Sequence, residues 1–306
     1  MVMYEPIYEP SPEEPTNALQ AFTKGLLATN DKPAPETVGD LVQALCEMYP
    51  PEDAEPWDRT GLLAGDPRAQ LTGVAVALDP TVQAIHEAAE LGANVLLTHH
   101  PVFLDPPTAI RPVGFGGSMS GAAVYEAVRC GVALVNFHTT LDVSTPAQDM
   151  LPGMLRLLRT GNLEPLPRDP SRGYGQICFA PENERVLTLA DLAARCTAVF
   201  GRPPRMWGDP ERIVQTVCTW TGGAGNAAEE CLRQNIDALV CGEIKYHAAL
   251  DAAAAGLCIL DLGHDVSERP FTGVLAESVA RTGVDRQRIF IVDTEDAWQH
   301  PEARRV

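Results

Sequence analysis

Residues 94–101 read NVLLTHHP, a short apolar run that stops at two adjacent histidines and a proline. Further along, residues 132–142 read VALVNFHTTLD, again an apolar run followed by a histidine and then a carboxylate. Helical patterns at residues 81–91 and 120–130 precede these runs, and residues 71–78 form another apolar run. Strands that alternate with helices of this length indicate parallel βαβ units, so the sequence predicts an α/β fold.

The second half of the chain continues this alternation. Its apolar runs predict strands at residues 176–180, 213–220, 238–241, 257–262 and 289–292. Helical patterns lie between most of them, at residues 187–200, 227–234, 246–255 and 274–282. A looser stretch at residues 165–171 contains three prolines and separates the two halves. The pattern therefore predicts an N-terminal lobe at residues 36–164 and a C-terminal lobe at residues 165–306.

The two halves resemble each other where their strands end. In the first half a helix and a strand lead to His138, and in the second half a similar pair leads to His264. A carboxylate follows each histidine four residues later, Asp142 in one case and Glu268 in the other. This internal repeat predicts two similar βαβ-type lobes with a dinuclear metal site in the cleft between them.

Composition restricts the class of protein. The 306 residues include 41 acidic and 23 basic side chains, a net charge of −18, which argues against nucleic acid or an anionic membrane as a partner. Eight cysteines occur without a CxxC pair, which predicts buried thiols in a reducing compartment. No targeting segment or membrane span is visible, so we expect a cytoplasmic protein. Residues 1–35 are rich in proline and acid, and we expect a disordered tail.

Histidines gather at the predicted strand ends. Of the seven in the chain, four lie there: His99, His100, His138 and His264. Ligands bind outside the carboxyl ends of strands in open α/β sheets, and imidazole with carboxylate suits zinc, iron, manganese or cobalt. Adjacent histidines on extended backbone point to opposite faces, and a turn at Pro101 would bring both into one pocket, each toward a different ion. The pattern favours two divalent metal ions per chain.

Several motifs together resemble a known family. They are WDRTGLLAGD at residues 57–66, LLTHHP at 96–101, HTTLD at 138–142, GGAG at 222–225 and GHDVSER at 263–269. The chain is similar in these motifs, over about residues 37–292, to the GTP cyclohydrolase 1 type 2 homologue family, also called the Ngg-interacting-factor-three-like family. The family commonly has Asp-Asn-Val-Gly-Leu where this chain has Asp58-Arg59-Thr60-Gly61-Leu62.

The resemblance implies a two-lobed α/β fold, a homohexamer and a dinuclear metal centre. The family's ligands fall on His99, His100, Asp142, His264 and Glu268. In the resulting hypothesis Glu268 is the catalytic residue that bridges the ions, His100 and Asp142 hold one ion, and His99 and His264 hold the other. A shared water would act as nucleophile.

Two further side chains are candidates of a different kind. His138 would orient Asp142 rather than bind metal, and Glu243, at a strand end, either lines the pocket or begins a solvated helix. The predicted activity is hydrolysis of a nucleotide or another phosphorylated or cyclic small molecule. Two alternatives stay open: a metal-binding scaffold or metal-handling protein, and an oxygen-using di-iron enzyme.

Overall fold

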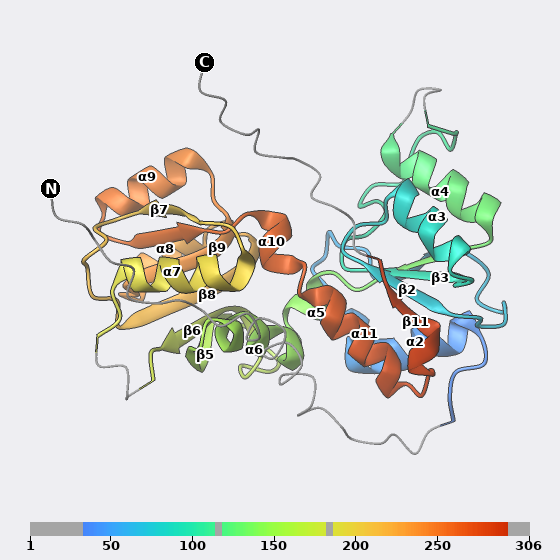
Figure 1. Ribbon diagram of the computed structural model, residues 1–306, viewed down its shortest axis with the longest axis horizontal. Coiled ribbons are helices and arrows are strands. Elements are labelled where there is room, and N and C mark those ends of the chain that lie inside the picture. Colours follow the sequence, from blue (N-terminus) through green and yellow to red (C-terminus); the bar gives the residue numbers. More distant parts are fainter. Residues whose placement is uncertain (1–32, 114–117, 182–185, 293–306) are drawn as a thin grey trace, which may run out of the picture. The chain divides into compact units, whose positions relative to one another are not determined.

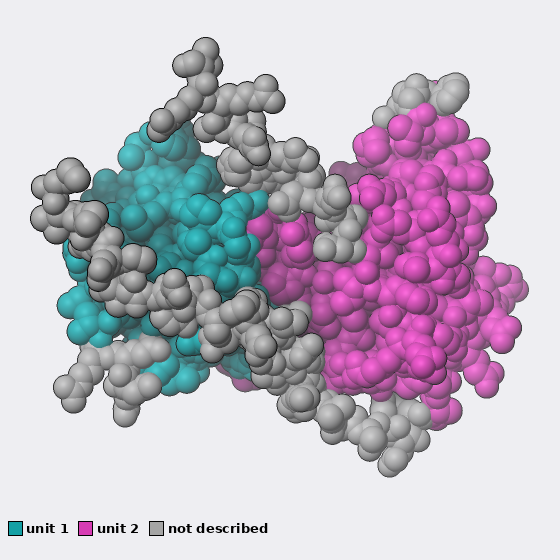
Figure 2. Space-filling model, viewed as in Figure 1, with its two compact units in different colours: residues 1–29, 149–163, 175–263 teal, residues 30–148, 164–174, 264–306 magenta. Residues whose placement is uncertain are grey.

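The computed structural model describes residues 33–113, 118–181 and 186–292. Most of the tail predicted to be disordered, residues 1–32, lies outside the described residues. The chain forms two compact units, coloured separately in Figure 2. Counting only the described residues, unit 1 contains residues 149–163 and 175–263, and unit 2 contains residues 33–148, 164–174 and 264–292.

Unit 2 is built on a five-stranded sheet (Figure 1). Its strand order is β1 (Gly61–Ala64), β4 (Ala133–Asn136), β3 (Val95–Thr98), β2 (Val74–Ala77) and β11 (Ile289–Ile291). Only β1 is antiparallel to its neighbour; the other four strands run parallel. Every residue of β2, β3 and β4 is buried, as expected for parallel strands covered on both faces. The predicted parallel βαβ arrangement is confirmed for this unit.

Helices cover both faces of this sheet. On one face lie α3 (Val82–Glu90) and α4 (Met119–Cys130), whose alanines pack on Ala75, Leu96 and Leu134. On the other lie α2 (Val38–Met48) and α11 (Phe271–Arg281), which contact each other and the sheet (Figure 1). Threonine or serine hydroxyls cap α2, α3 and α4, so three of these helices begin where the sequence supplies a capping side chain.

Unit 1 is built on a six-stranded sheet. Its order is β5 (Leu158–Pro165), β6 (Gly173–Phe179), β8 (Thr216–Gly223), β9 (Ala238–Glu243), β10 (Cys258–Asp261) and β7 (Arg205–Trp207). The central strands β8, β9 and β10 are parallel, while β6 and β7 flank them antiparallel. The helices are α7 (Leu189–Phe200), α8 (Ala227–Arg233) and α9 (Tyr246–Ala254). Cys218, Cys231 and Cys241 are buried where α8 and α9 pack on the sheet, which confirms the expectation of buried thiols for these residues.

The division of the chain differs from the expected cut after residue 164. Residues 264–292 belong to unit 2 together with the described residues of 33–148. The reason is that β11 pairs in parallel with β2, and α11 packs against β2 and β3. The proline-containing stretch at 165–171 follows the end of β5 and precedes β6. Each unit is therefore assembled from separate segments of the chain, whereas the sequence pattern predicted one continuous segment for each lobe.

Short connecting elements complete the two units. They are 3-10 helices η1 (Pro51–Asp53) and η2 (Arg286–Arg288), and α-helices α5 (Thr139–Asp142), α6 (Thr145–Met154) and α10 (His264–Glu268). Across the described ranges, no helix is long and apolar enough to cross a membrane.

Candidate metal centre

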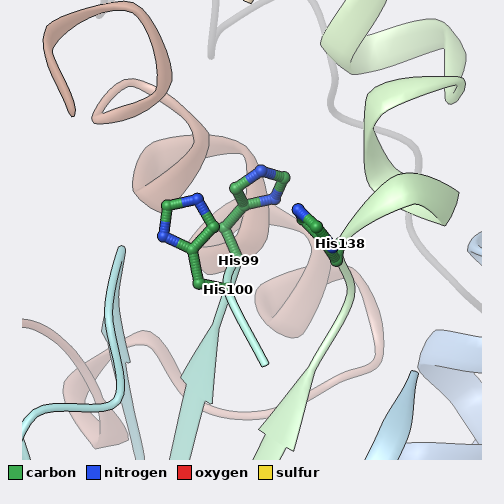
Figure 3. A group of neighbouring side chains, drawn as sticks. All are labelled: His99, His100 and His138. Atoms are coloured by element: carbon green, nitrogen blue, oxygen red, sulfur yellow. The ribbon is translucent and has the colours of Figure 1, made fainter. Parts of the chain in front are cut away.

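Six candidate side chains come from two strand ends and two one-turn helices, all within unit 2. His99 and His100 directly follow β3, and His138 follows β4 by two residues. Figure 3 shows the three imidazole rings together beyond the arrowheads of these strands. Ring centroids are 4.9 Å apart for His99 and His100 and 5.0 Å apart for His99 and His138. The two adjacent histidines therefore do share one cluster, as expected.

The matched offset of four residues has a local structural cause. His138 is the N-cap of α5 and Asp142 is its last residue, while α10 begins at His264 and ends at Glu268. Residues four apart lie on the same face of a helix, so each histidine and its carboxylate face the same way. In α10, His264 Nε2 lies 3.0 Å from Glu268 Oε2.

His99 is fully buried and its orientation is set by the backbone. Its Nδ1 lies 3.2 Å from the carbonyl oxygen of Phe137, which can only accept, so Nδ1 carries the hydrogen. The ring packs against Phe271 with centroids 4.8 Å apart. A metal ion would bind His99 through the lone pair of Nε2, and among the described residues this buried nitrogen has no hydrogen-bond partner.

His100 and His138 are held in the same way by carboxylates. His100 Nδ1 lies 2.8 Å from Asp79 Oδ1, and His138 Nδ1 lies 3.0 Å from Asp58 Oδ1. Asp58 is buried and also accepts the backbone N–H and the hydroxyl of Thr139. Metal-bound histidines almost always donate their other N–H to a carboxylate or carbonyl. In all three imidazoles at the sheet edge, Nδ1 therefore contacts a carbonyl or carboxylate oxygen, as in metal-bound histidines.

Glu268 lies at the centre of the cluster. Its Oε1 is 3.6 Å from His99 Nε2, and its Oε2 is 3.0 Å from Nε2 of both His100 and His264. The carboxyl group is 4% exposed, and Oε2 makes no aligned hydrogen bond within the described structure. Asp142 Oδ1 lies 3.7 Å from His99 Nε2 and is also buried without a hydrogen-bond partner among those residues. Buried polar atoms are normally satisfied, so this concentration of unsatisfied donor atoms fits divalent cations.

The side chains fall into two overlapping sets of metal-ligand spacing. His99, Asp142 and Glu268 form one set, and His100, His264 and Glu268 form the other, with the ligand atoms of each set within 4.8 Å of one another. Glu268 is common to both, through different oxygens. This grouping differs from the expected assignment, which placed Asp142 with His100 and His264 with His99. His99 and His100 fall in different sets here, although a third group contains both.

His138 has a different environment from the one expected. Its Nδ1 contacts Asp58, and the structure groups it with His99 and His100, their ligand atoms again within 4.8 Å. Glu243 is the exposed last residue of β9 in unit 1, so its pocket role stays a prediction. Sequence reasoning did not assign roles to Asp58 and Asp79. Asp58 lies within the WDRTGLLAGD motif, and this position could have indicated a role at the site. For Asp79, the only indication in the sequence is its position shortly after β2.

Charge in the cluster is strongly coupled. Burial opposes a charged His100, but its hydrogen bond to Asp79 and its close contact with the Glu268 carboxylate outweigh this and raise its pKa to about 10. Burial, with repulsion from Glu268, raises the pKa of Asp142 to about 8. Burial also opposes ionisation of Glu268, yet electrostatic attraction to His99 and the close contacts with His100 and His264 hold its pKa well below the ordinary value. A cation bound among these groups would displace protons from His100 and Asp142.

An aromatic and a cationic side chain stand beside the cluster. Trp57 is 53% exposed, and its ring lies edge-on to His138 with centroids 5.7 Å apart. Arg59, two residues later, is also exposed. Tyr174 lies near Asp142 and Glu55, and its pKa is raised by burial and by these two carboxylates.

Residues 36–296 match the family model described as Duf34/NIF3 (NGG1p interacting factor 3). A protein of Streptomyces coelicolor named GTP cyclohydrolase 1 type 2 homolog is 33% identical over 242 residues, covering 76% of this chain and 82% of the relative. A Clostridium perfringens protein of the same name is 27% identical and covers 84% and 96%. The fold is similar to that of a Staphylococcus aureus hypothetical protein, with a TM-score of 0.78 at 23% identity, covering 87% of this chain and all of that one.

Proposed function

This chain belongs to the Duf34/NIF3 family, and on that premise we propose that it is a metal-dependent hydrolase with a dinuclear centre in unit 2. The observation that carries the proposal is the convergence of buried, unsatisfied donor atoms from His99, Asp142 and Glu268. Each would otherwise leave a polar group buried without a partner, at a cost of about 1–3 kcal/mol. The same atoms have the spacing of metal ligands.

His99 and Asp142 would hold one ion, and His100 and His264 the other, with Glu268 contributing one oxygen to each. The contacts that support this division are those of Glu268, whose Oε1 faces His99 and whose Oε2 faces His100 and His264. The donor set is nitrogen and oxygen without sulfur, which suits zinc, iron or manganese. Two such cations would act as Lewis acids and lower the pKa of a bound water toward about 7.

The protein's own residues would prepare the site in three ways. The Asp79 and Asp58 carboxylates fix the ring orientation of His100 and His138, so their Nε2 atoms point into the cluster before any ligand arrives. Glu268 places negative charge between the two ligand sets and reduces repulsion between two cations. His138, within ligand distance of His99 and His100, would bind either an ion or the substrate.

The proposed substrate is a nucleotide or another phosphorylated or cyclic small molecule. Trp57 offers an exposed aromatic face beside His138, and base stacking on such a face contributes about 1–3 kcal/mol. Exposed Arg59 would supply a positive charge for a phosphate. The curated relatives carry the name of a GTP cyclohydrolase homolog, which is compatible with a nucleotide. A homohexamer and a cytoplasmic location remain predictions of the same resemblance.

The test is elemental analysis of protein purified without chelator, coupled to a hydrolysis screen of nucleotides and phosphoesters. We expect about two transition-metal ions per chain, and turnover that is lost with Glu268→Gln and retained with Glu90→Gln, an exposed carboxylate at the end of α3. Protein that holds both ions but hydrolyses nothing in the screen would favour a metal-binding scaffold or metal-handling role. Oxygen consumption after anaerobic loading with iron would favour a di-iron enzyme. Protein that cannot be loaded with metal would refute the proposal.

A further inference from the structure

A second group of metal-ligand side chains lies away from this centre, where α3 packs on α4. It consists of His86, Glu126 and Cys130, and one ligand atom from each lies within 4.8 Å of the others. None of the three belongs to the motifs that resemble the family or to the ligand sets around Glu268. The group combines an imidazole, a carboxylate and a thiol.

Local sequence explains how these residues meet. Glu126 and Cys130 are four residues apart in the last turns of α4, so both face the same side of that helix. Alanines line the contact between α3 and α4, including Ala84, Ala88 and Ala127. Because these side chains are small, the helices approach closely enough for His86 of α3 to reach Glu126, with His86 Nε2 3.1 Å from Glu126 Oε2.

The Glu126 carboxylate of this group is ionised, and its neighbours hold it in position. Glu126 is 8% exposed, and hydrogen bonds from His86 and Arg129 hold its pKa below the ordinary value. Arg129 Nε donates to the same Oε2 at 2.7 Å, so the described contacts of this carboxylate converge on one oxygen. The other carboxylate oxygen of Glu126, Oε1, remains available to bind a metal ion. The Arg129 side chain is 56% exposed and can rotate into solvent.

We propose that His86, Glu126 and Cys130 form a second metal site that binds a single zinc-type cation. Zinc accepts nitrogen, oxygen and sulfur ligands together, and a set of three protein ligands leaves one coordination position for water or another molecule. A thiolate and a carboxylate neutralise the dication. His86, with a side chain 42% exposed, lies where a cation can enter from solvent. The centre around Glu268 has no sulfur ligand, so the two sites differ in chemistry.

Cobalt(II) titration of the full chain tests this difference. Thiolate ligation gives cobalt(II) an intense near-ultraviolet charge-transfer absorption, which a site of histidines and carboxylates does not produce. We expect the absorption in the wild-type protein, its loss in Cys130→Ser and its weakening in His86→Ala. It should persist in Glu268→Gln, which weakens metal binding at the other centre, and in Cys46→Ser, which removes the chain's other partly buried thiol.

Two results would overturn the proposal: no charge-transfer absorption at saturating cobalt, or an absorption that survives Cys130→Ser. A measurement on the unaltered protein guards against misfolded variants. Zinc should slow alkylation of Cys130 by iodoacetamide, read by peptide mass, while Cys46 reacts at an unchanged rate. Equal rates at Cys130 with and without zinc would also reject the site. Because none of these readouts depends on hydrolysis, the outcome is independent of the function proposed above.

Discussion

The two units use the same parallel-strand architecture but treat buried charge at their strand ends differently. In unit 1, Asp261 ends β10 and is fully satisfied: Oδ2 lies 2.6 Å from Arg205 and accepts the Ile244 N–H at 3.1 Å. In unit 2, Glu268 is equally buried and Asp142 is partly exposed, yet each keeps a buried carboxylate oxygen without a hydrogen-bond partner among the described residues. Removing a partner from a satisfied buried carboxylate destabilises a fold, whereas a carboxylate left unsatisfied indicates an additional ligand.

Replacement of Glu268 by glutamine should have the largest effect. The volume is kept, but the negative charge between two ligand sets is lost, so we expect at least one of about two ions to leave. Asp142→Asn should cost less metal, because Asp142 belongs to only one set. Metal content by elemental analysis, with folding checked by circular dichroism, measures both. If folded Glu268→Gln keeps both ions, its shared role is wrong.

Acidity should weaken metal binding steeply. A cation must displace the proton of His100, whose pKa is raised to about 10, and that of Asp142, raised to about 8. Near pH 7 both groups hold protons in the metal-free protein, so loading should release about two protons per chain. Affinity should therefore rise with pH up to about 10, and more steeply below about 8, where both groups hold protons. Calorimetry in buffers of different ionisation enthalpy counts these protons; a count near zero would contradict the assignment.

The outer contact of His138 can be removed without touching a ligand of either set. Asp58→Ala deletes the carboxylate that accepts from His138 Nδ1 and from Thr139. Loss of such an outer partner typically lowers metal affinity about 10–100-fold. Competition with a chromogenic chelator measures the change. An unchanged affinity would mean that His138 takes no part in metal binding, and Asp66→Ala, an exposed carboxylate in the same motif, is the control.

The smallest effect is expected from the satisfied carboxylate of unit 1. Asp261→Asn weakens the ion pair with Arg205 and the bond from Ile244, so the free energy of unfolding should fall by about 1–2 kcal/mol. Metal content should not change, since Asp261 belongs to neither ligand set. Thermal unfolding with elemental analysis distinguishes the two outcomes. Loss of metal in this variant would contradict the distinction between the carboxylate of unit 1, which has its partners, and those of unit 2, which are expected to bind metal.

Much of the fold could be predicted from local pattern. Buried strands such as β3 and β4 are short apolar runs, and helices such as α4 and α7 show helical spacing with capping residues, so both are visible within a dozen residues. The strands β1, β5 and β7 were not predicted. All three are outermost strands of their sheets, so their partly exposed sequences carry little apolar pattern, and β7 has only three residues.

The sequence by itself determined the chemistry of the site: histidines after strands, each with a carboxylate four residues on where a one-turn helix follows. These features depend on neighbours in the chain and on residue type. Tertiary structure alone decided that β11 joins β2 across more than 200 residues, that Asp142 groups with His99 rather than His100, and that Asp58 and Asp79 orient two histidines. These three features depend on which distant segments of the chain pack together. Local sequence does not distinguish one such pairing from another, so only the packed structure decides between them.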